Sequence, residues 1–370
     1  MKKLIFRKFA KDTLIFFSIM CLTVGLIVWT LQAVNYFDFV TQDGHGLKTY
    51  FSYTLLNFPK IVHRIIPFIF FISLFYILIT YEEKNELSIF WVNGVTKIDF
   101  TNKILLLSIF LTIFQIGLGS FFSPLAQLKA RESLKNSNID FFTSLIREGK
   151  FINAVDGLTI FIDKKNMDNS YSNIFIDDST KNSSKMIYAK GGVIIDSNQR
   201  KVFQLFNGKV INNDKTKINV FKFDQIDFNL ADYSSNSIIM PKIQERSSIN
   251  LFNCISFFYF EKPLFGKPLN CDKNLNKEIN QELFKRFYKP LFIPIIGLLC
   301  CFLIIIPKNN FIYNKNKKLI FLFTFFLIVF SEASLRYSAI SKISVLFYLI
   351  LPWLLFALIY SYFLRKSSYV

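Results

Sequence analysis

Three carboxylates cluster in one short stretch of an otherwise basic chain. The stretch YEEKNELSIFWVNGVTK (residues 81–97) holds Glu82, Glu83 and Glu86, whereas the formal net charge of the whole sequence is +18. Carboxylates grouped in this way can form charge-assisted hydrogen bonds to an arginine or lysine of another element. Their role therefore depends on which element carries them and on what that element faces.

The spacing of residues 82–93 predicts a helix of about three turns, and Gly94 is placed to end it. One face of this helix is apolar, because its members recur at i, i+3, i+4 and i+7. They are Leu87, Phe90, Trp91 and Gly94. The residues alone leave two interpretations open. One is a solvated interfacial helix with its tryptophan at the lipid headgroups, and the other is a docking helix whose acidic flank meets an arginine of a partner.

No other stretch has a catalytic or metal-binding pattern. The sequence contains no G-x-x-x-x-G-K-[ST] loop for ATP and no G-x-S-x-G turn for a nucleophilic serine. His45 and His63 are the only histidines, and no CxxC or Cys/His ligand set occurs. We therefore predict no catalytic residue, no metal site and no cofactor on this chain, and a protein that moves, holds or couples something.

Six apolar runs are long enough to cross a membrane, for which a helix needs about 20 apolar residues. Of the 370 residues, 52% are hydrophobic and 46 are Phe, which is typical of the membrane class. The first run follows a basic leader, but it is too long for a signal peptide and lacks a small-x-small cleavage site, so we interpret it as an anchor. The runs are 13–37, 65–81, 104–128, 290–307, 319–335 and 343–364.

The distribution of Lys and Arg around these runs predicts the orientation of the chain. Basic residues concentrate in the leader, in the loop that holds the three glutamates, in residues 308–318 and at the C-terminus, all on one side. By the positive-inside rule, both termini and that loop are cytoplasmic. The aromatic residues lie within the apolar runs and not among the basic residues, so the positive charge does not indicate nucleic-acid binding.

The polar segment between the third and fourth runs predicts a domain outside the membrane. We divide the chain into residues 1–128 with three spans, 129–285 with an exoplasmic β domain and its connecting segments, and 286–370 with three more spans. Strand-like runs indicate a sandwich or jelly-roll-like fold. They are 158–162, 173–177, 186–195, 202–211 and 218–228. Several are apolar on both parities, which fits a packed core or a greasy cleft, and Gly191–Gly192 predicts a bulge or tight bend.

Two of the five cysteines, Cys254 and Cys271, lie in this outer segment. A disulfide between them is compatible with an oxidising compartment. The alternative is two unpaired thiols that serve as small hydrophobic side chains. The other three, Cys21, Cys300 and Cys301, lie in the spans.

Several motifs along the chain are similar to those of one transporter family. They are the six spans with a single β insert after the third, the pattern E-x-E/N-E-L-x-x-x-x-x-x-G from Glu82 to Gly94, PKIVHRIIP (59–67) and ELFKRFYKPLFIP (282–294). With these features the chain resembles the permease subunits of the lipopolysaccharide-export ABC transporter, the LptF/LptG family. The phrase LIREGKF (145–151) is more similar to the LptF branch.

The resemblance implies a multi-pass permease in the inner membrane of a Gram-negative bacterium, with its β domain in the periplasm. It implies as partners a sister permease of the LptG type and a cytoplasmic ATPase dimer of the LptB type, which binds ATP and Mg²⁺. It also implies a single-span LptC-type protein, a periplasmic LptA-type bridge toward the outer membrane, and lipopolysaccharide as cargo. The helix after the second span would dock on the ATPase, with Glu86 as the acidic contact and Glu82 and Glu83 as looser candidates.

Charged residues at the exoplasmic span ends are candidates for the path of the lipid, because its phosphates need cations there. By position they are Arg64, Arg336 and Lys342. Glu332 lies inside the fifth run, where a charge costs about 2.5–3.5 kcal/mol on insertion scales. It therefore needs either a pair with Arg336 at i, i+4 or solvation by a cavity or a partner helix.

Glu282 and Arg286 are also spaced i, i+4, and Pro290 marks the start of the fourth span. This arrangement indicates a structural role in setting where that span begins.

Two other classes of protein compete with the transporter permease. A membrane-anchored scaffold could recruit a periplasmic partner through its β domain, but it would not need an acidic docking helix on the other side of the membrane. A secondary transporter usually shows repeated halves and helices broken near the midplane, whereas Pro67, Pro124 and Pro290 fall near span ends.

Overall fold

The structure is a computed structural model with two compact units. It describes residues 2–37, 40, 46–136, 148–155, 157–166, 170–179, 184–197, 200–214, 217–229, 242–260, 262, 271, 273–308, 310–339 and 341–368. The helical unit comprises Met1–Val34, Thr54–Ala130 and Pro241–Val370, and the sheet unit comprises Asn35–Tyr53 and Arg131–Met240. The segment 242–285, which the sequence analysis grouped with the β insert, therefore packs with the helices.

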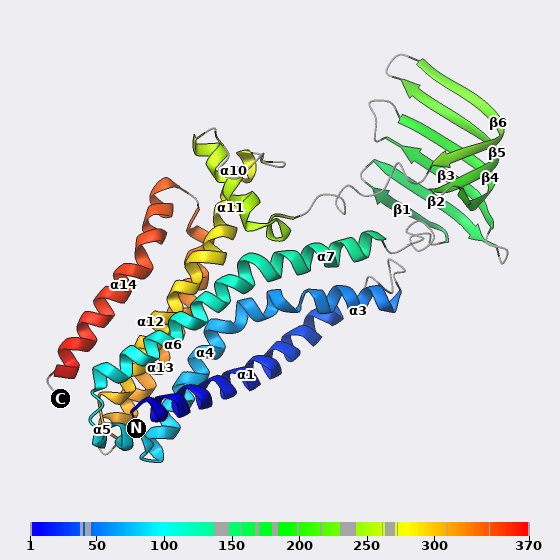
Figure 1. Ribbon diagram of the computed structural model, residues 1–370. Helices are drawn as coiled ribbons and strands as arrows, with labels where there is room; N and C mark the ends of the chain where they lie inside the picture. The colour runs from blue at the N-terminus through cyan, green and yellow to red at the C-terminus, as the bar shows by residue number, and fades with distance from the viewer. Residues whose placement is uncertain are drawn as a thin grey trace. The chain divides into compact units, whose positions relative to one another are not determined.

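The described part of the chain contains six helical stretches long and apolar enough to cross a membrane, which confirms the predicted spans. The chain is thus a membrane helical protein with a β insert. The helices extend beyond the apolar runs because flanking charged residues continue them. They are α1 (Lys2–Asn35), α3 (Leu47–Leu56) with α4 (Phe58–Glu83), α6 (Lys97–Gly117) with α7 (Ser123–Asn136), α11 (Asn276–Leu283) with α12 (Phe292–Cys301), α13 (Tyr313–Tyr337) and α14 (Lys342–Ser368) (Figure 1).

Helices α4, α6 and α12 form the centre of the helical unit. Phe70 of α4 and Ile296 of α12 are 0% exposed, and both belong to one large hydrophobic cluster. By contrast, α1, α13 and α14 expose large apolar side chains such as Leu22, Phe326 and Leu346. Such exposed apolar faces suit contact with lipid tails or with the helices of another membrane subunit.

The fourth span is built from several short pieces. After α11 come a π-helical segment (Phe284–Tyr288) and a 3₁₀ turn (Lys289–Leu291), and α12 follows. Pro290 lies in the 3₁₀ turn, where a residue without an N–H is tolerated. The third span also contains a π-helical segment, Leu118–Phe122, between α6 and α7. These changes of helical pitch alter the directions of the side chains in and after them, including Arg286 and Lys289 of the fourth span.

The β insert is a six-stranded antiparallel sheet in which each strand pairs with the next along the chain. Five strands coincide with the predicted runs, whereas β1 was not predicted. The predicted all-β character of the insert is confirmed, and the strands follow one another as a meander in a single sheet. They are β1 (Lys150–Val155), β2 (Leu158–Lys165), β3 (Ser170–Asp178), β4 (Ser184–Ser197), β5 (Arg200–Asp214) and β6 (Lys217–Asn229) (Figure 1).

A line of interruptions, which we call the crease, crosses the ladder from β2 to β6. It consists of Asp163, Asn173, Lys190, Asn207 and Asp224, which lie opposite one another between paired positions. Asn173 and Asn207 have positive φ angles of 50° and 51°. Asparagine tolerates this left-handed conformation better than most residues. The crease is therefore encoded by residue types that accept the strained backbone.

The crease changes which side chains point inward. In β3, Tyr171 is buried before the crease and Ile174 and Ile176 after it, so the buried parity switches from odd to even. Side chains of a regular strand alternate with a period of two, so the switch turns the inner face of the strand. One buried cluster takes members from both sides of the crease, such as Ile176 and Phe203. The folded sheet thus supplies both layers of its own core, and burial there raises the pKa of Tyr171.

Small residues are needed where the folded sheet is tightest. A Cβ at Gly208 would overlap the carbonyl oxygen of Tyr188 and the ring of Phe223. Gly191 and Gly192 follow the crease residue of β4 and pair regularly with Phe206 and Leu205, so the irregularity predicted at this pair lies one residue earlier, at Lys190.

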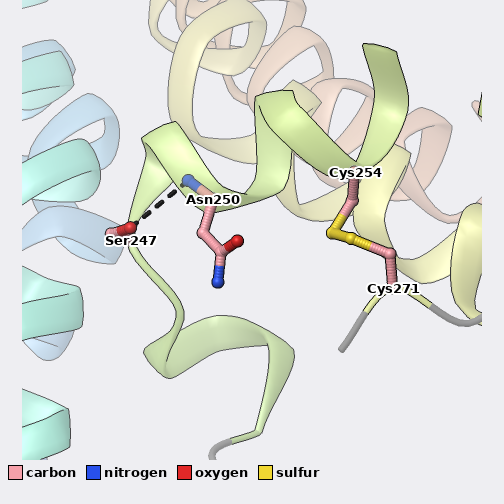
Figure 2. The surroundings of a disulfide bond; sticks show 4 residues. All are labelled: Ser247, Asn250, Cys254 and Cys271. Carbon is pink, nitrogen blue, oxygen red and sulfur yellow. Dashed lines mark hydrogen bonds between the residues drawn. A yellow bond between two sulfur atoms is a disulfide. The ribbon is translucent and has the colours of Figure 1, made fainter. Parts of the chain in front are cut away.

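A disulfide joins Cys254 of α10 (Ser248–Phe260) to Cys271, with their Cα atoms 5.4 Å apart (Figure 2). Of the two alternatives that the sequence left open, the bridge is the one observed. Helix α10 was not predicted. Its buried side, with Leu251, packs against Ile279 and Leu283 of α11. The disulfide therefore fixes α10 to the residues that immediately precede the fourth span.

We predict that Gly208→Ala destabilises the β insert and that Gly191→Ala does not. Overpacking of this kind costs about 1–3 kcal/mol. At Gly191 an added Cβ would meet only the carbonyl oxygen of Tyr171, at an ordinary contact distance of 3.7 Å. Limited proteolysis of the full-length protein in detergent, read as the rate of cleavage between residues 150 and 229, measures the difference. Equal cleavage rates of the two variants would contradict the crease.

Candidate functional site

The segment between the second and third spans, residues 82–94, contains the end of α4 and a second, short helix. Helix α4 stops at Glu83, Asn85 adopts a left-handed conformation with a φ of 60°, and α5 (Glu86–Val92) follows. The predicted single helix is therefore two helices. Gly94 has a φ of 70° and ends α5 as predicted, since the N–H of Val95 donates to the carbonyl of Phe90 over 3.0 Å.

The apolar face of α5 packs into the chain itself. Phe90 is 1% exposed, and its ring lies 5.0 Å from that of Phe100 in α6 and 5.3 Å from that of Phe6 in α1. Phe9 of α1 contacts the rings of Phe100 and Tyr81. This aromatic cluster joins α1, α4, α5 and α6, so α5 cannot move without the three long helices.

The three glutamates also find partners within the chain. Glu86 pairs with Lys8 of α1 at 3.2 Å. Glu82 accepts a hydrogen bond of 3.0 Å from the backbone N–H of Lys308, which follows the fourth span. Glu83 pairs with Lys317 of α13 at 3.6 Å. The cluster of carboxylates therefore ties the loop to the first, fourth and fifth spans.

The surface that α5 leaves open differs from the predicted one. Leu87 is 2% exposed and Phe90 1%, because both fill the core beneath the helix, and Trp91 is half-buried. The exposed apolar side chains are instead Ile89, at 50%, and Val92, at 86%. A row of apolar residues along one side of a predicted helix indicates a side that is covered in the folded protein. In α5 that side is covered by α1 and α6 of the same chain. A partner would therefore meet Ile89 and Val92.

At the other end of these helices, Arg286 is a buried hub. It lies in the π-helical segment of the fourth span, and its side chain is 1% exposed. Its Nε donates to Glu282 at 3.0 Å, and its Nη atoms donate to the carbonyl oxygens of Gln244 and Arg246 and to Oγ of Ser248, at 2.9–3.0 Å. The i, i+4 pair predicted from the sequence is confirmed, and it belongs to a larger network.

Ser248 connects the two π-helical segments. Its Oγ accepts from Arg286 and donates to the carbonyl oxygen of Ser120, at 2.8 Å, in the π-helical segment of the third span. Neighbouring Gly119 leaves room for the ring of His63, which a Cβ would strike. Gln115 donates to the carbonyl oxygen of His63 at 2.9 Å. Sequence reasoning missed Ser248, since a lone serine before an apolar helix carries no distinguishing signal.

Glu332 forms its ion pairs with residues of neighbouring helices and not with Arg336. It forms an ion pair with the buried Lys289 of the fourth span and a second with Arg64 of α4, at 3.5 Å. The predicted pair between Glu332 and Arg336 is therefore not the one observed, whereas the alternative of solvation by another helix is. The 3₁₀ turn before α12 rotates Lys289 toward α13 and makes it the partner.

A cavity of about 560 Å³ lies beside this network in the helical unit. Arg336 lines it together with Lys242, Arg246 and Lys285, and two carboxylates, Glu278 and Glu282, offset part of their charge. Of the predicted lipid-path residues, Arg64 and Glu332 thus form an ion pair with each other. Arg336 lies apart from that pair and contributes positive charge to the wall of the cavity. Lys342 begins α14, and its side chain lies outside the described residues.

The described residues contain no group of three His, Cys, Asp or Glu side chains that could hold a metal ion. His45 lies outside the described part of the chain.

Two comparisons place the chain among known proteins. The family model for the lipopolysaccharide export system permease LptF/LptG matches residues 7–366, and it covers both branches of that family. A protein of Rickettsia prowazekii (strain Madrid E), described as uncharacterized protein RP871, is 24% identical over 207 residues. That match covers 55% of this chain and 57% of the relative, so the chain spans little more than half of the relative's length.

We predict that Arg286→Met strongly destabilises the helical unit. Breaking a buried ion pair by removing one partner costs about 3–5 kcal/mol, because the other charge stays buried and unpaired. Lys285→Met is the matched control, since Lys285 pairs with the same carboxylate at 3.2 Å but is 29% exposed. Thermal unfolding in detergent measures both. Equal losses in the two variants would show that Arg286 is not the hub.

Proposed function

Because the chain belongs to the LptF/LptG family of lipopolysaccharide export permeases, we propose that it is a permease subunit that extracts lipopolysaccharide from the inner membrane. In this proposal it pairs with a sister permease and rests on a cytoplasmic ATPase dimer, which binds ATP and Mg²⁺. The extracted lipid passes to a single-span periplasmic partner and then to a bridge toward the outer membrane. The β insert is the part of the chain that meets these periplasmic partners.

The observation that carries the coupling part of the proposal is the construction of α5. The helix presents Ile89 and Val92 outward, and its inner face is fixed by Phe90 and the aromatic cluster. Exposed apolar side chains on a short helix can be covered by a partner, because the buried core of a protein interface is apolar. Because α5 packs against α1, α4 and α6, a displacement of its docking partner would move these three helices together.

The cost of moving the cargo explains why a permease needs an apolar path. Each CH₂ group removed from apolar surroundings costs about 0.8 kcal/mol, so exposing several acyl chains to water would cost tens of kcal/mol. A cavity of about 580 Å³ with apolar walls opens beside α1 and supports such a path. Its walls come from α1, α3, α4 and α6 and include Phe17, Leu22, Val62 and Phe114.

Lipopolysaccharide also carries phosphates, and these need cations at the end of the apolar path. The cationic cavity around Arg336 and Lys285 supports this part of the proposal. Charge-assisted hydrogen bonds to a phosphate are about twice as strong as neutral ones.

The disulfide supports an exoplasmic β insert, because disulfides persist in oxidising compartments. We predict that Cys254 and Cys271 in intact cells react with a thiol reagent only after reduction. Cys254→Ser should lower stability by about 3 kcal/mol, since a disulfide constrains the unfolded chain. Cys21→Ser is the matched control, because Cys21 is a free cysteine in a span. Labelling of both cysteines without reductant would show that the two thiols are free and would remove this support for an exoplasmic segment.

We predict that Val92→Asp and Ile89→Asp release the ATPase without disturbing the permease. Both residues are exposed, so the substitutions leave the core intact while placing a charge in an apolar contact, which should weaken binding by about 2 kcal/mol or more. Phe311→Ser is the matched control, because Phe311 is fully exposed on the loop before α13. Co-purification of the ATPase and the sister permease in detergent measures the result.

If the wild-type chain retains the ATPase and both α5 variants also retain it, the contact lies elsewhere. If the wild-type chain retains neither protein, a membrane-anchored scaffold becomes the better description of this chain. The scaffold has no use for a rigid docking helix at the end of the spans opposite to Arg286.

A further inference from the structure

A cavity of about 390 Å³ lies between the fourth, fifth and sixth spans, at the ends that the distribution of Lys and Arg predicts to be cytoplasmic. The fourth span contributes Leu299 of α12 and Phe302 of the 3₁₀ turn that follows it. Helices α13 and α14 contribute exposed side chains, such as Phe323 at 52% and Leu358 at 59%. The volume falls within the range of small-molecule sites, about 300–1,000 Å³.

The polar side chains of this cavity gather at one end of it. Asn316 lies near the start of α13, and Tyr362 and Lys366 lie near the end of α14. Asn316 comes just before the apolar run 319–335 begins, and Lys366 just after the apolar run 343–364 ends. The polar end of the cavity therefore lies at the level of the membrane surface, and its apolar part lies within the spans.

The positive charge at the polar end is not compensated. Nζ of Lys366 lies 5.9 Å from the centre of the Tyr362 ring, which stacks on the ring of Phe302 at 5.8 Å. A second lysine, the exposed Lys315, precedes Asn316. In the part of the chain that the structure describes, neither lysine forms an ion pair and no carboxylate lines the cavity. This end of the cavity therefore suits an anionic group.

The length of the cavity corresponds to one leaflet of a bilayer. Leu358 precedes Lys366 by eight residues, which is about 12 Å of helix at 1.5 Å per residue. Asn316 precedes Phe323 by seven residues, which is about 10 Å. Half of a hydrocarbon core of about 30 Å is roughly 15 Å. The cavity wall thus extends from the surface through most of one leaflet.

We propose that this cavity binds an anionic glycerophospholipid of the cytoplasmic leaflet, with one acyl chain in the apolar part and the headgroup at Lys366 and Lys315. Such a lipid has its charge and its apolar length in the same order as the wall. Basic pockets between spans on the cytoplasmic side bind anionic headgroups in this way. The proposal rests on the predicted orientation of the spans and goes beyond the proposed function, because this lipid is a bound component of the permease and not its cargo.

A helix of another subunit fits this cavity less well than an acyl chain does. With its side chains an α-helix is about 10–12 Å across, so a length of 12 Å occupies roughly 900 Å³ or more. That is more than twice the volume of about 390 Å³ that is present. An apolar helix would also leave the charge of Lys366 without a partner. The size and the charge of the cavity therefore favour a lipid over a protein segment.

The test is native mass spectrometry of the full-length chain in detergent, titrated with palmitoyl-oleoyl phosphatidylglycerol or with the zwitterionic phosphatidylcholine of the same acyl chains. The variants are Lys366→Gln alone and with Lys315→Gln, which remove charge, and Leu358→Trp, which fills the apolar part. Lys103→Gln is the matched control for charge, because Lys103 is exposed near the start of α6 and does not line the cavity. Leu346→Trp is the matched control for size, because Leu346 is 61% exposed near the start of α14.

We expect the wild-type chain to bind phosphatidylglycerol about tenfold or more tightly than phosphatidylcholine. Lys366→Gln should weaken binding of phosphatidylglycerol about fivefold and the double variant about 25-fold, because each lysine near an anionic headgroup contributes about fivefold. Leu358→Trp should weaken binding of both lipids about tenfold or more, since each acyl CH₂ group displaced is worth about fourfold. Lys103→Gln and Leu346→Trp should leave both affinities unchanged.

Equal binding of the two lipids by the wild-type chain, or equal losses in the variants and their controls, would overturn the proposal. So would a complex with the sister permease that holds no phosphatidylglycerol and that Leu358→Trp dissociates, because the cavity would then be a protein contact. Co-purification with the ATPase reports on the proposed function separately. If it persists while the lipid preference fails, the permease assignment stands and this site is wrong.

Discussion

A guanidinium that remains charged inside a bundle of apolar helices constrains much of the helical unit. Arginine does not lose its proton in proteins, so Arg286, at 1% exposed, must be supplied with acceptors. Glu282 lies one turn away, and the others come from Gln244, Arg246 and Ser248, which lead back from the β insert. The chain that returns to the membrane is therefore fixed by the residue that begins the fourth span. The π-helical segments follow from the same need, because they rotate Arg286 and the carbonyl of Ser120 toward Ser248.

The β insert meets a different constraint, since one sheet must bury a hydrophobic face with no second sheet among the described strands. The crease crosses the ladder from β2 to β6 and turns the buried face of the strands from β3 to β6 at one line. Asn173 and Asn207 accept the left-handed backbone, and Gly208 leaves room for the ring that crosses it. The line that creates the core also leaves a hollow on the opposite face.

The sequence predicted the six spans, five of the six strands and the end of α5 at Gly94, because each leaves a local signal: an uncharged run, a β-branched run, a glycine. It did not predict the crease, although the signal was present. The runs that are apolar on both parities have two causes: the buried parity switches within β3, and in the run 158–162, which ends before the crease, Phe161 lies on the face opposite the core residues Ile160 and Ile162. Nor could it identify what covers a face. The stripe with Phe90 marks a buried side of α5, but only the fold shows that α1 and α6 bury it. The partner of Glu332 depended on the pitch of the turn that holds Lys289, which spacing alone does not give.

Helix α12 connects the two clusters of the helical unit by direct contacts. At one end, Lys97 donates to the carbonyl oxygen of Ile305, and Glu82 accepts from the N–H of Lys308. At the other end, Lys289 begins the turn into α12 and holds Glu332 of α13. Between them the helix is buried on all sides, with Ile293, Ile295 and Ile296 at 0% exposure. Close-packed interiors transmit displacement because they have no space to absorb it. The two residues that flank α5, Glu82 and Lys97, are therefore joined through the buried fourth span to the ion pairs around Glu332. The loop motif and the motif of the fourth span, far apart in the sequence, thus meet at the two ends of the same buried helix.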